Sequence, residues 1–319
     1  MASALNSLWW WLLWSSSSSY AVATLLYDSS FVDGVVVLGR SLVRHQRDPT
    51  VEMVALVTAE VWREAKAALR SERWRLVEVS AVASPAPRVS SDRLRFAYTK
   101  LAVFNLTRYD RVAYIDADAV VLGDVGELFA CAAEFCAVLR HCELFNTGVF
   151  VVRPSARLAN DVARKASSTF SYTGGDQGFL NAYFRDFERC PYFSSSDTKD
   201  NDYVRCRRLP ATYNGDWPLL FAQGGGPQKK NKAAAGESRD RKIRVQHMTL
   251  GSVKPWTWSI APFFPTVAAW QSYSTARVDL AAASTPTPAV AACVLLCAIF
   301  GRPLRRRVAR SAVSLGLLA

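Results

Sequence analysis

Histidine is scarce in this chain, with three residues among 319, and none of the seven cysteines forms a CxxC pair. Zinc sites need cysteine and histidine ligands clustered at short spacings, so a zinc site is not expected. The odd number of cysteines leaves two alternatives open. Either one or two disulfides form in a secretory lumen, or the cysteines are buried free thiols.

Acidic residues are outnumbered, 27 against 39 basic residues, which gives a formal net charge of +12. The excess is local: residues 229–244 carry seven basic and two acidic side chains, and five arginines lie between 302 and 310. The sequence has neither a basic face interleaved with aromatic residues nor a zinc-finger spacing. Nucleic-acid binding is therefore not expected, and no pattern indicates an oligomeric state.

Half of the residues are hydrophobic, which is enough for one substantial α/β core. Strands are expected over 21–26, 53–57 and 74–79, and helices over 34–44 and 61–71. This alternation predicts parallel βαβ units in a doubly wound sheet. Further along, we expect helices over 96–105, 125–129, 156–167 and 179–184, and strands over 112–115, 137–139, 145–154 and 243–247.

Two carboxylates separated by one alanine, Asp116 and Asp118, follow directly after the apolar run 112–115. Because the chain turns into a loop at the end of a strand, both side chains can converge on one point. Hard oxygen ligands so placed suit Mg²⁺ or Mn²⁺, with positions left for substrate phosphates. The alternative is an acidic turn that only caps the strand. A second apolar turn, Ala119–Leu122, follows the carboxylates and favours the metal site.

Two later segments also carry candidate site residues. Three glycines surround Asp176 and Gln177 in YTGGDQGFLNAY, where they allow a ligand to approach the backbone closely. Asp176 would open the helix that follows, and on these residues alone it reads equally well as a simple N-cap. His247 precedes TLGSVKPW, in which Gly251 and Lys254 supply a turn and a cation suited to a diphosphate. The alternative is a structural histidine.

The two ends of the chain differ from its middle. Residues 1–20 hold an apolar, tryptophan-rich run followed by five serines. We interpret them as a poor signal sequence, an interfacial aromatic anchor or the product of a wrong start site. Ala289–Phe300 is apolar and uncharged and is followed by the arginine-rich tail. It predicts a membrane anchor with a cytosolic tail and a lumenal catalytic part, with a buried helix as the alternative. The expected division is therefore 1–20, a catalytic domain at 21–275, and a tail at 276–319.

Six segments, in order, resemble the family 8 retaining glycosyltransferases, and among them the plant glucuronosyltransferases that act on inositol phosphorylceramide. The resemblance extends from about Ala21 to Trp270. It implies a single Rossmann-like nucleotide-sugar-binding domain of GT-A type, with a mixed, mainly parallel sheet. The segments are TLLYDSSFVDGVVVLGRSL, YTKL, YIDADAVVL, FNTGVFVV, SYTGGDQGFLNAYF and HMTLGSVKPW.

The resemblance assigns the donor UDP-sugar to particular side chains. Lys100 would contact the sugar or the diphosphate, and Gly251 with Lys254 would close over the leaving diphosphate. The uridine pocket would be lined by Leu25, Tyr27 and Phe31.

The resemblance also implies the chemical centre. A divalent metal, usually Mn²⁺ but alternatively Mg²⁺, would be bound by Asp116, Asp118 and His247. An imidazole in such a set moves the preference toward Mn²⁺. The side chains near the anomeric carbon would be Asn146, Asp176 and Gln177. Retention would follow either front-face attack or a double displacement with Asp176 as nucleophile.

The sequence departs from glycogenins in two places. Thr173 stands where they often carry an acidic residue, and after Tyr213 no tyrosine follows until Tyr273, so self-glucosylation is disfavoured. We therefore expect a metal-dependent enzyme of the Golgi or another secretory membrane. It would move a hexose or hexuronic acid from a UDP-sugar to a lipid or glycan acceptor, favouring an inositol phosphosphingolipid. The alternatives are a glycogenin-like or xylan-modifying transferase, a metal-dependent phosphohydrolase or nucleotidyltransferase, and a non-catalytic lectin-like relative.

Overall fold

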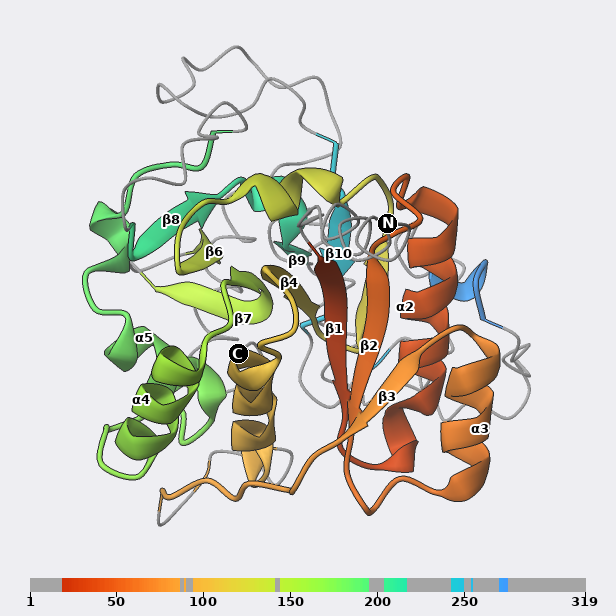
Figure 1. The fold of residues 1–319 in the computed structure, drawn as a ribbon, viewed down its shortest axis with the longest axis horizontal. Helices are drawn as coiled ribbons and strands as arrows, with labels where there is room; N and C mark the ends of the chain where they lie inside the picture. Colours follow the sequence, from red (N-terminus) through yellow and green to blue (C-terminus); the bar gives the residue numbers. More distant parts are fainter. Residues whose placement is uncertain are drawn as a thin grey trace, which may run out of the picture.

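The computed structural model describes residues 19–86, 89, 94–140, 144–194, 204–216, 242–249, 254 and 270–274. Its first part alternates strands and helices as expected (Figure 1). The strands are parallel neighbours, β1 pairing with β2 and β2 with β3. These elements are β1 (Tyr20–Leu26), α2 (Val32–His45), β2 (Glu52–Val57), α3 (Arg63–Ser71) and β3 (Arg75–Glu78).

The central sheet has seven strands in the order β3-β2-β1-β4-β7-β6-β8. It continues through β4 (Arg111–Ile115), β6 (Phe135–Leu139), β7 (Phe145–Val152) and β8 (Cys206–Leu209). β4 runs parallel to β1 and β8 parallel to β6, whereas β7 is antiparallel to both of its neighbours. The expected mixed, mainly parallel sheet is confirmed.

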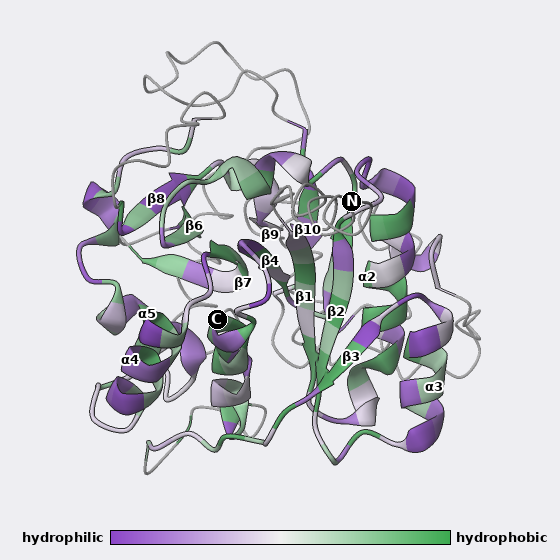
Figure 2. Cartoon of the chain, viewed as in Figure 1, coloured by the Kyte–Doolittle hydropathy of each residue, from purple (hydrophilic) through white to green (hydrophobic). Residues whose placement is uncertain are grey.

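Side chains alternate between the two faces of this sheet, and both faces are covered. In β1, Val22 and Leu26 pack into a core with α2 and α3 on one face. Ala21 and Ala23 face a second core, formed with α4 (Ala156–Ala166) and α5 (Asp176–Tyr183) on the other face. Because successive strand residues point to opposite faces, burial on both sides requires the continuous apolar runs seen in the sequence. Figure 2 shows these apolar strands inside helices with polar outer surfaces.

Two expected helices have a different geometry. The segments predicted over 96–105 and 125–129 form 3-10 helices, η3 (Ala97–Asn105) and η4 (Gly126–Ala130). Periodicity over so few residues does not separate three residues per turn from 3.6. In η3 this geometry buries three consecutive residues, Tyr98, Thr99 and Lys100.

A second, three-stranded sheet joins distant parts of the chain, in the order β5-β10-β9. Its strands are β5 (Ala119–Val121), β9 (Gly215–Asp216) and β10 (Val245–His247). The prediction of an apolar turn at Ala119–Leu122 was wrong, because these residues pair antiparallel with β10 and place Ala119 opposite His247. This pairing brings the histidine to the carboxylate segment.

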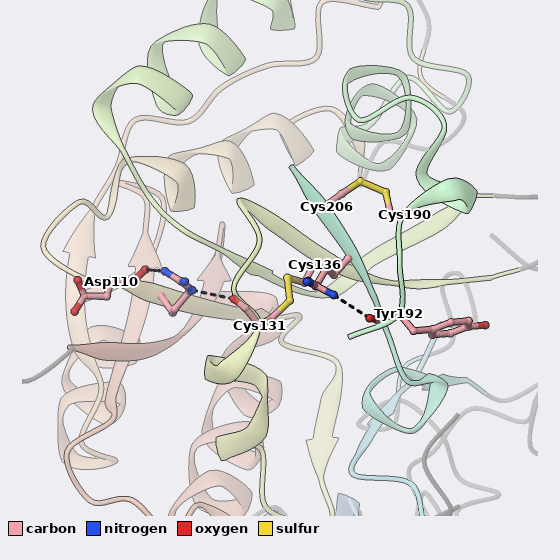
Figure 3. The surroundings of a disulfide bond; sticks show 8 residues. Asp110, Cys131, Cys136, Cys190, Tyr192 and Cys206 are labelled. Carbon is pink, nitrogen blue, oxygen red and sulfur yellow. Dashed lines mark hydrogen bonds between the residues drawn. A yellow bond between two sulfur atoms is a disulfide. The ribbon is translucent and has the colours of Figure 1, made fainter. Parts of the chain in front are cut away.

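Four cysteines form two disulfides, which excludes the free-thiol alternative for these four (Figure 3). Cys131–Cys136 ties the end of η4 to β6 within the core on the α2 face. Cys190–Cys206 ties the chain after η6 (Phe187–Arg189) to β8, next to the core on the opposite face. The two disulfides therefore crosslink segments on opposite faces of the sheet, next to β6 and β8.

Several sequence predictions lie outside the described residues: the N-terminal run up to residue 18, Gly251, most of the basic segment 229–244, and the apolar segment 289–300. Within the described part of the chain, no helix has both the length and the hydrophobicity needed to cross a membrane. The proposed division at residues 20 and 275 stays a prediction.

Candidate active site

A cavity of about 310 Å³ opens where β1 and β4 end and β7 begins. It takes its lining from segments far apart in the sequence, because parallel strands bring their carboxyl ends to the same edge of the sheet. Eleven of the twelve residues singled out from the sequence line it, and the twelfth, Gly251, is not described. The eleven are Leu25, Tyr27, Phe31, Lys100, Asp116, Asp118, Asn146, Asp176, Gln177, His247 and Lys254.

Asp116, Asp118 and His247 converge on one point of this cavity. The His247 Nε2 atom lies 3.2 Å from Asp118 Oδ1 and 3.7 Å from Asp116 Oδ2. One ligand atom from each side chain lies within 4.8 Å of the other two. The backbone holds this geometry, because the Met248 amide donates to the Asp118 carbonyl at 3.0 Å.

This donor set fits a divalent metal. Two carboxylates and an imidazole nitrogen are ligands that Mn²⁺ and Mg²⁺ accept, and the nitrogen favours Mn²⁺. Anionic oxygens that face one another are stable in a buried site only when cations lie close by. Two lysines, Lys100 and Lys254, supply such charge beside Asp116 and Asp118.

Lys100 holds two carboxylates together from the wall of the cavity. Its Nζ atom lies 3.0 Å from Asp116 Oδ1 and 3.0 Å from Asp176 Oδ2, and 4.9 Å from the ring centroid of Tyr114. Burial alone would lower the pKa of Lys100, but Asp116 and Asp176 together raise it above its ordinary value. The amine is therefore a permanent cation at neutral pH.

Lys254 is the buried cation that pairs with Asp118, as Lys100 pairs with Asp116. Its amine forms an ion pair with Asp118 Oδ2 and donates to the Met248 carbonyl at 3.3 Å. Burial would raise the pKa of Asp118, but Lys254, and after it His247, outweigh burial and hold that pKa well below its usual range. Asp118 is therefore ionised at neutral pH.

Asp176 is not an N-cap, which settles the alternative that the sequence left open. The N-cap of α5 is Gly175, and Asp176 is the first residue of the helix. Its side chain accepts a hydrogen bond from the Thr147 hydroxyl at 2.7 Å, so it points across the cavity toward β7. The neighbouring Gln177 accepts from the Asn146 amide at 2.8 Å.

The far end of the cavity is aromatic and apolar. Tyr27 stacks on Phe96 with ring centroids 4.6 Å apart and an angle of 13° between the planes. Leu25 and Phe31 complete this wall, at the end of β1 and in the 3-10 helix η1 (Ser29–Phe31). A flat apolar wall of this kind suits a planar base.

Sequence reasoning did not single out several polar residues that line the cavity or support its side chains, among them Tyr114, Thr147, Asn214 and Arg140. Tyr114 lies two residues before Asp116, in β4, and its hydroxyl donates to Asp116 Oδ1 at 2.9 Å. The period of two in a strand could have placed its side chain on the same face as Asp116. The contacts of Asn214 and Arg140 with the site come from tertiary structure, and no local pattern indicates them.

At Gly148, a glycine of the described part of the chain, an added methyl group would enter the ligand set. A Cβ there would lie 1.9 Å from His247 Cε1, and the Gly148 carbonyl also accepts from the Asp116 amide at 2.8 Å. We expect Gly148→Ala to displace the imidazole and weaken Mn²⁺ binding about tenfold or more. Calorimetric titration measures this effect, with Gly126→Ala as control, where the nearest atom lies at 3.3 Å. Unchanged affinity in Gly148→Ala would contradict the assignment of His247.

Comparison with known proteins identifies relatives of this chain. Residues 22–143 match the family described as Glycosyl transferase family 8. The chain is 41% identical over 256 residues to inositol phosphorylceramide glucuronosyltransferase 1 of Arabidopsis thaliana, covering 79% of this chain and 45% of the relative. It is 30% identical over 248 residues to glycogenin-1 of Homo sapiens, covering 76% and 63% respectively. The chain thus spans about half the length of the curated relatives it matches.

A solved structure shows the same fold. An active-site mutant of LgtC superposes with a TM-score of 0.58 at 14% sequence identity, over 79% of this chain and 94% of LgtC. At this identity the likeness concerns the fold alone, which is that of the GT-A glycosyltransferases. The family model and the sequence relatives lead to one assignment: the chain belongs to glycosyl transferase family 8.

Proposed function

We propose that this cleft moves a hexose or hexuronic acid from a UDP-sugar to an acceptor, with retention of anomeric configuration and with Mn²⁺ or Mg²⁺ held by Asp116, Asp118 and His247. The observation that carries the proposal is the meeting of these three ligands with two buried lysines in one cavity. A phosphohydrolase, a nucleotidyltransferase and a lectin-like protein are disfavoured, because family and fold agree on a glycosyltransferase.

Each end of the donor has a matching wall. Leu25, Tyr27 and Phe31 provide an apolar and aromatic surface for the uracil ring. A metal bound beside the carboxylates supplies Lewis-acid charge to the diphosphate. Lys254 offsets the negative charge that develops on the leaving UDP, which is stabilisation specific to the transition state.

The sugar lies between Lys100 and the start of α5. Asn146 and Gln177 offer amide groups for sugar hydroxyls, and the Asp176 carboxylate directly precedes Gln177. Asp176 is paired with Lys100 and accepts from the Thr147 hydroxyl, and both contacts reduce its nucleophilicity. They favour front-face attack through an oxocarbenium ion over a double displacement through Asp176.

The acceptor we propose is an inositol phosphosphingolipid. Two observations support it: the likeness to a plant enzyme with that acceptor in its name, and the lack of tyrosine between Tyr213 and Tyr273, where a glycogenin-like enzyme would glucosylate itself. The two disulfides support an oxidising compartment such as the Golgi lumen. The apolar segment 289–300 supports membrane attachment.

One experiment tests both donor and acceptor. Purified protein is incubated with labelled UDP-glucuronic acid, UDP-glucose or UDP-galactose and with inositol phosphorylceramide vesicles, and products are identified by mass spectrometry. We expect label in the lipid phase with one donor and none with Asp118→Asn. Label on the protein itself, or on added xylan oligosaccharides only, would overturn the lipid acceptor in favour of a glycogenin-like or xylan-modifying enzyme. Protease protection in intact microsomes tests the lumenal orientation.

A further inference from the structure

A network of hydrogen-bonded polar side chains runs from Arg140 to the cavity residue Gln177, and its two middle members, Asn214 and Asn146, are buried. Arg140, which follows β6, donates to Asn214 Oδ1 at 2.7 Å and to the Asn214 carbonyl at 2.9 Å. Asn214 lies between η7 (Ala211–Tyr213) and β9, and is fully buried. Its amide contacts both His247 and Asn146. One side chain thus touches a metal ligand and a residue of the sugar site.

Arg140 sets the donor-to-acceptor direction of the hydrogen bonds in this network. A guanidinium has only donors, so the Asn214 atom that faces Arg140 is necessarily the oxygen. Burial lowers the pKa of Arg140 to about 10, which still leaves it charged at neutral pH. The orientation of the Asn214 amide therefore follows from the chemistry of its partner.

The orientation of Asn214 decides the tautomer of His247. Asn214 Oδ1 lies 3.0 Å from His247 Nδ1, and an oxygen that only accepts requires a proton on Nδ1. With a proton held on Nδ1, the other nitrogen, Nε2, which lies 3.2 Å from Asp118 Oδ1, is the one that would bind a metal once it is deprotonated. This is the tautomer that a ligating histidine needs.

The nitrogen of the Asn214 amide orients the side chains of the proposed sugar site. Asn214 Nδ2 donates to Asn146 Oδ1 at 2.9 Å, and the Gly148 amide, another obligatory donor, reaches the same oxygen at 2.9 Å. Asn146 Nδ2 therefore faces Gln177 Oε1, at 2.8 Å. The Gln177 amide nitrogen is turned to the opposite side, where it donates to the Tyr172 hydroxyl at 3.2 Å.

We propose that Arg140 and Asn214 are positioning residues that fix the metal-binding tautomer of His247 and, through Asn146, the orientation of the Gln177 amide. The inference rests on the metal site of the proposed function. It assigns no contact with substrate to either residue. Both act by orienting side chains that line the cavity.

The test combines a spectroscopic signature with metal affinity. The chain has only three histidines, so ¹⁵N-imidazole spectra resolve His247 in the metal-free protein at alkaline pH. The wild type is expected to show a proton on Nδ1. Asn214→Leu and Arg140→Met should lose that single tautomer and bind Mn²⁺ about tenfold to a hundredfold more weakly. Arg207→Met is the matched control, since Arg207 also donates to a backbone carbonyl, that of Tyr192, without lining the cavity.

A second variant separates positioning from mere stability. Asn214→Asp keeps an acceptor for Arg140 and His247 but removes the donor to Asn146. It should retain the Nδ1 proton and Mn²⁺ affinity within about threefold, while kcat falls about tenfold or more. A wild-type His247 with its proton on Nε2, or an Asn214→Leu protein with unchanged tautomer and affinity, would overturn the proposal. If the wild type bound no Mn²⁺ but kept the expected tautomer, the proposed metal would fail and the positioning role would stand.

Discussion

Asp118→Asn should abolish sugar transfer, with kcat reduced about a thousandfold or more, while the protein remains folded. The substitution keeps an oxygen at the ligand position but removes the negative charge that attracts a divalent cation. Without the metal, the negative charge that develops on the diphosphate in the transition state would lose its main electrostatic partner. Such a loss corresponds to a decrease in kcat of about a thousandfold. The fold should survive because the Asp118 backbone contact with Met248 is untouched, and because Lys254 retains the Met248 carbonyl as a partner.

Metal removal provides the companion measurement. Chelator-treated wild-type protein should lose transfer and recover it with added Mn²⁺, whereas Asp118→Asn should not recover. Asp110→Asn is a suitable control, because Asp110 lies beyond the opposite end of β4 and contacts Ser19. Full activity in the chelated enzyme would show that the three converging ligands serve some purpose other than metal-dependent transfer.

Much of the fold could be predicted because the strands are buried on both faces. Continuous apolar runs at β1, β2 and β4, separated by helices, leave few arrangements other than a doubly wound sheet. The antiparallel direction of β7 could not be predicted in this way. A strand buried on both sides has the same apolar sequence whichever direction it runs.

The residues of the candidate site differed in how far local sequence could predict them. Asp116 and Asp118 follow a strand end, so their position could be inferred from local sequence alone. The contact of His247 with them depends on the pairing of β5 with β10, between segments more than a hundred residues apart. Only the resemblance to a family supplied this contact in advance.

Asn214 shows why the supporting residues escaped prediction. An asparagine after a tyrosine has no local signature of burial, and its partners Arg140 and His247 come from either side of it in the chain. Polar residues that satisfy one another inside a core are recognised only when the whole network is assembled.

Lys100→Met is expected to have the largest combined effect on stability and activity. The buried amine is the shared partner of Asp116 and Asp176, so its loss leaves two carboxylates facing each other without that cation. Breaking a buried ion pair on one side costs about 3–5 kcal/mol of folding free energy. Loss of the cation beside the donor should also lower kcat about a hundredfold or more.

The pH dependence has a definite sign. Folding raises the pKa of Lys100, so its contribution is fully present below the unfolded pKa of about 10.4 and is lost only as pH rises beyond the higher folded value. The stability difference between wild type and Lys100→Met should therefore be large throughout the neutral range. It should shrink in strong acid, where protonation of the carboxylates removes their repulsion.

Urea unfolding at several pH values, with and without Mn²⁺, measures this difference. Because the metal also supplies positive charge to Asp116, Mn²⁺ should stabilise Lys100→Met more than it stabilises the wild type. Lys66→Met is the matched control: Lys66 pairs with Glu78 at 3.0 Å at the surface, where such a pair contributes at most about 1 kcal/mol. A Lys100→Met protein as stable as Lys66→Met, with no added response to Mn²⁺, would mean that Lys100 does not hold the two carboxylates together.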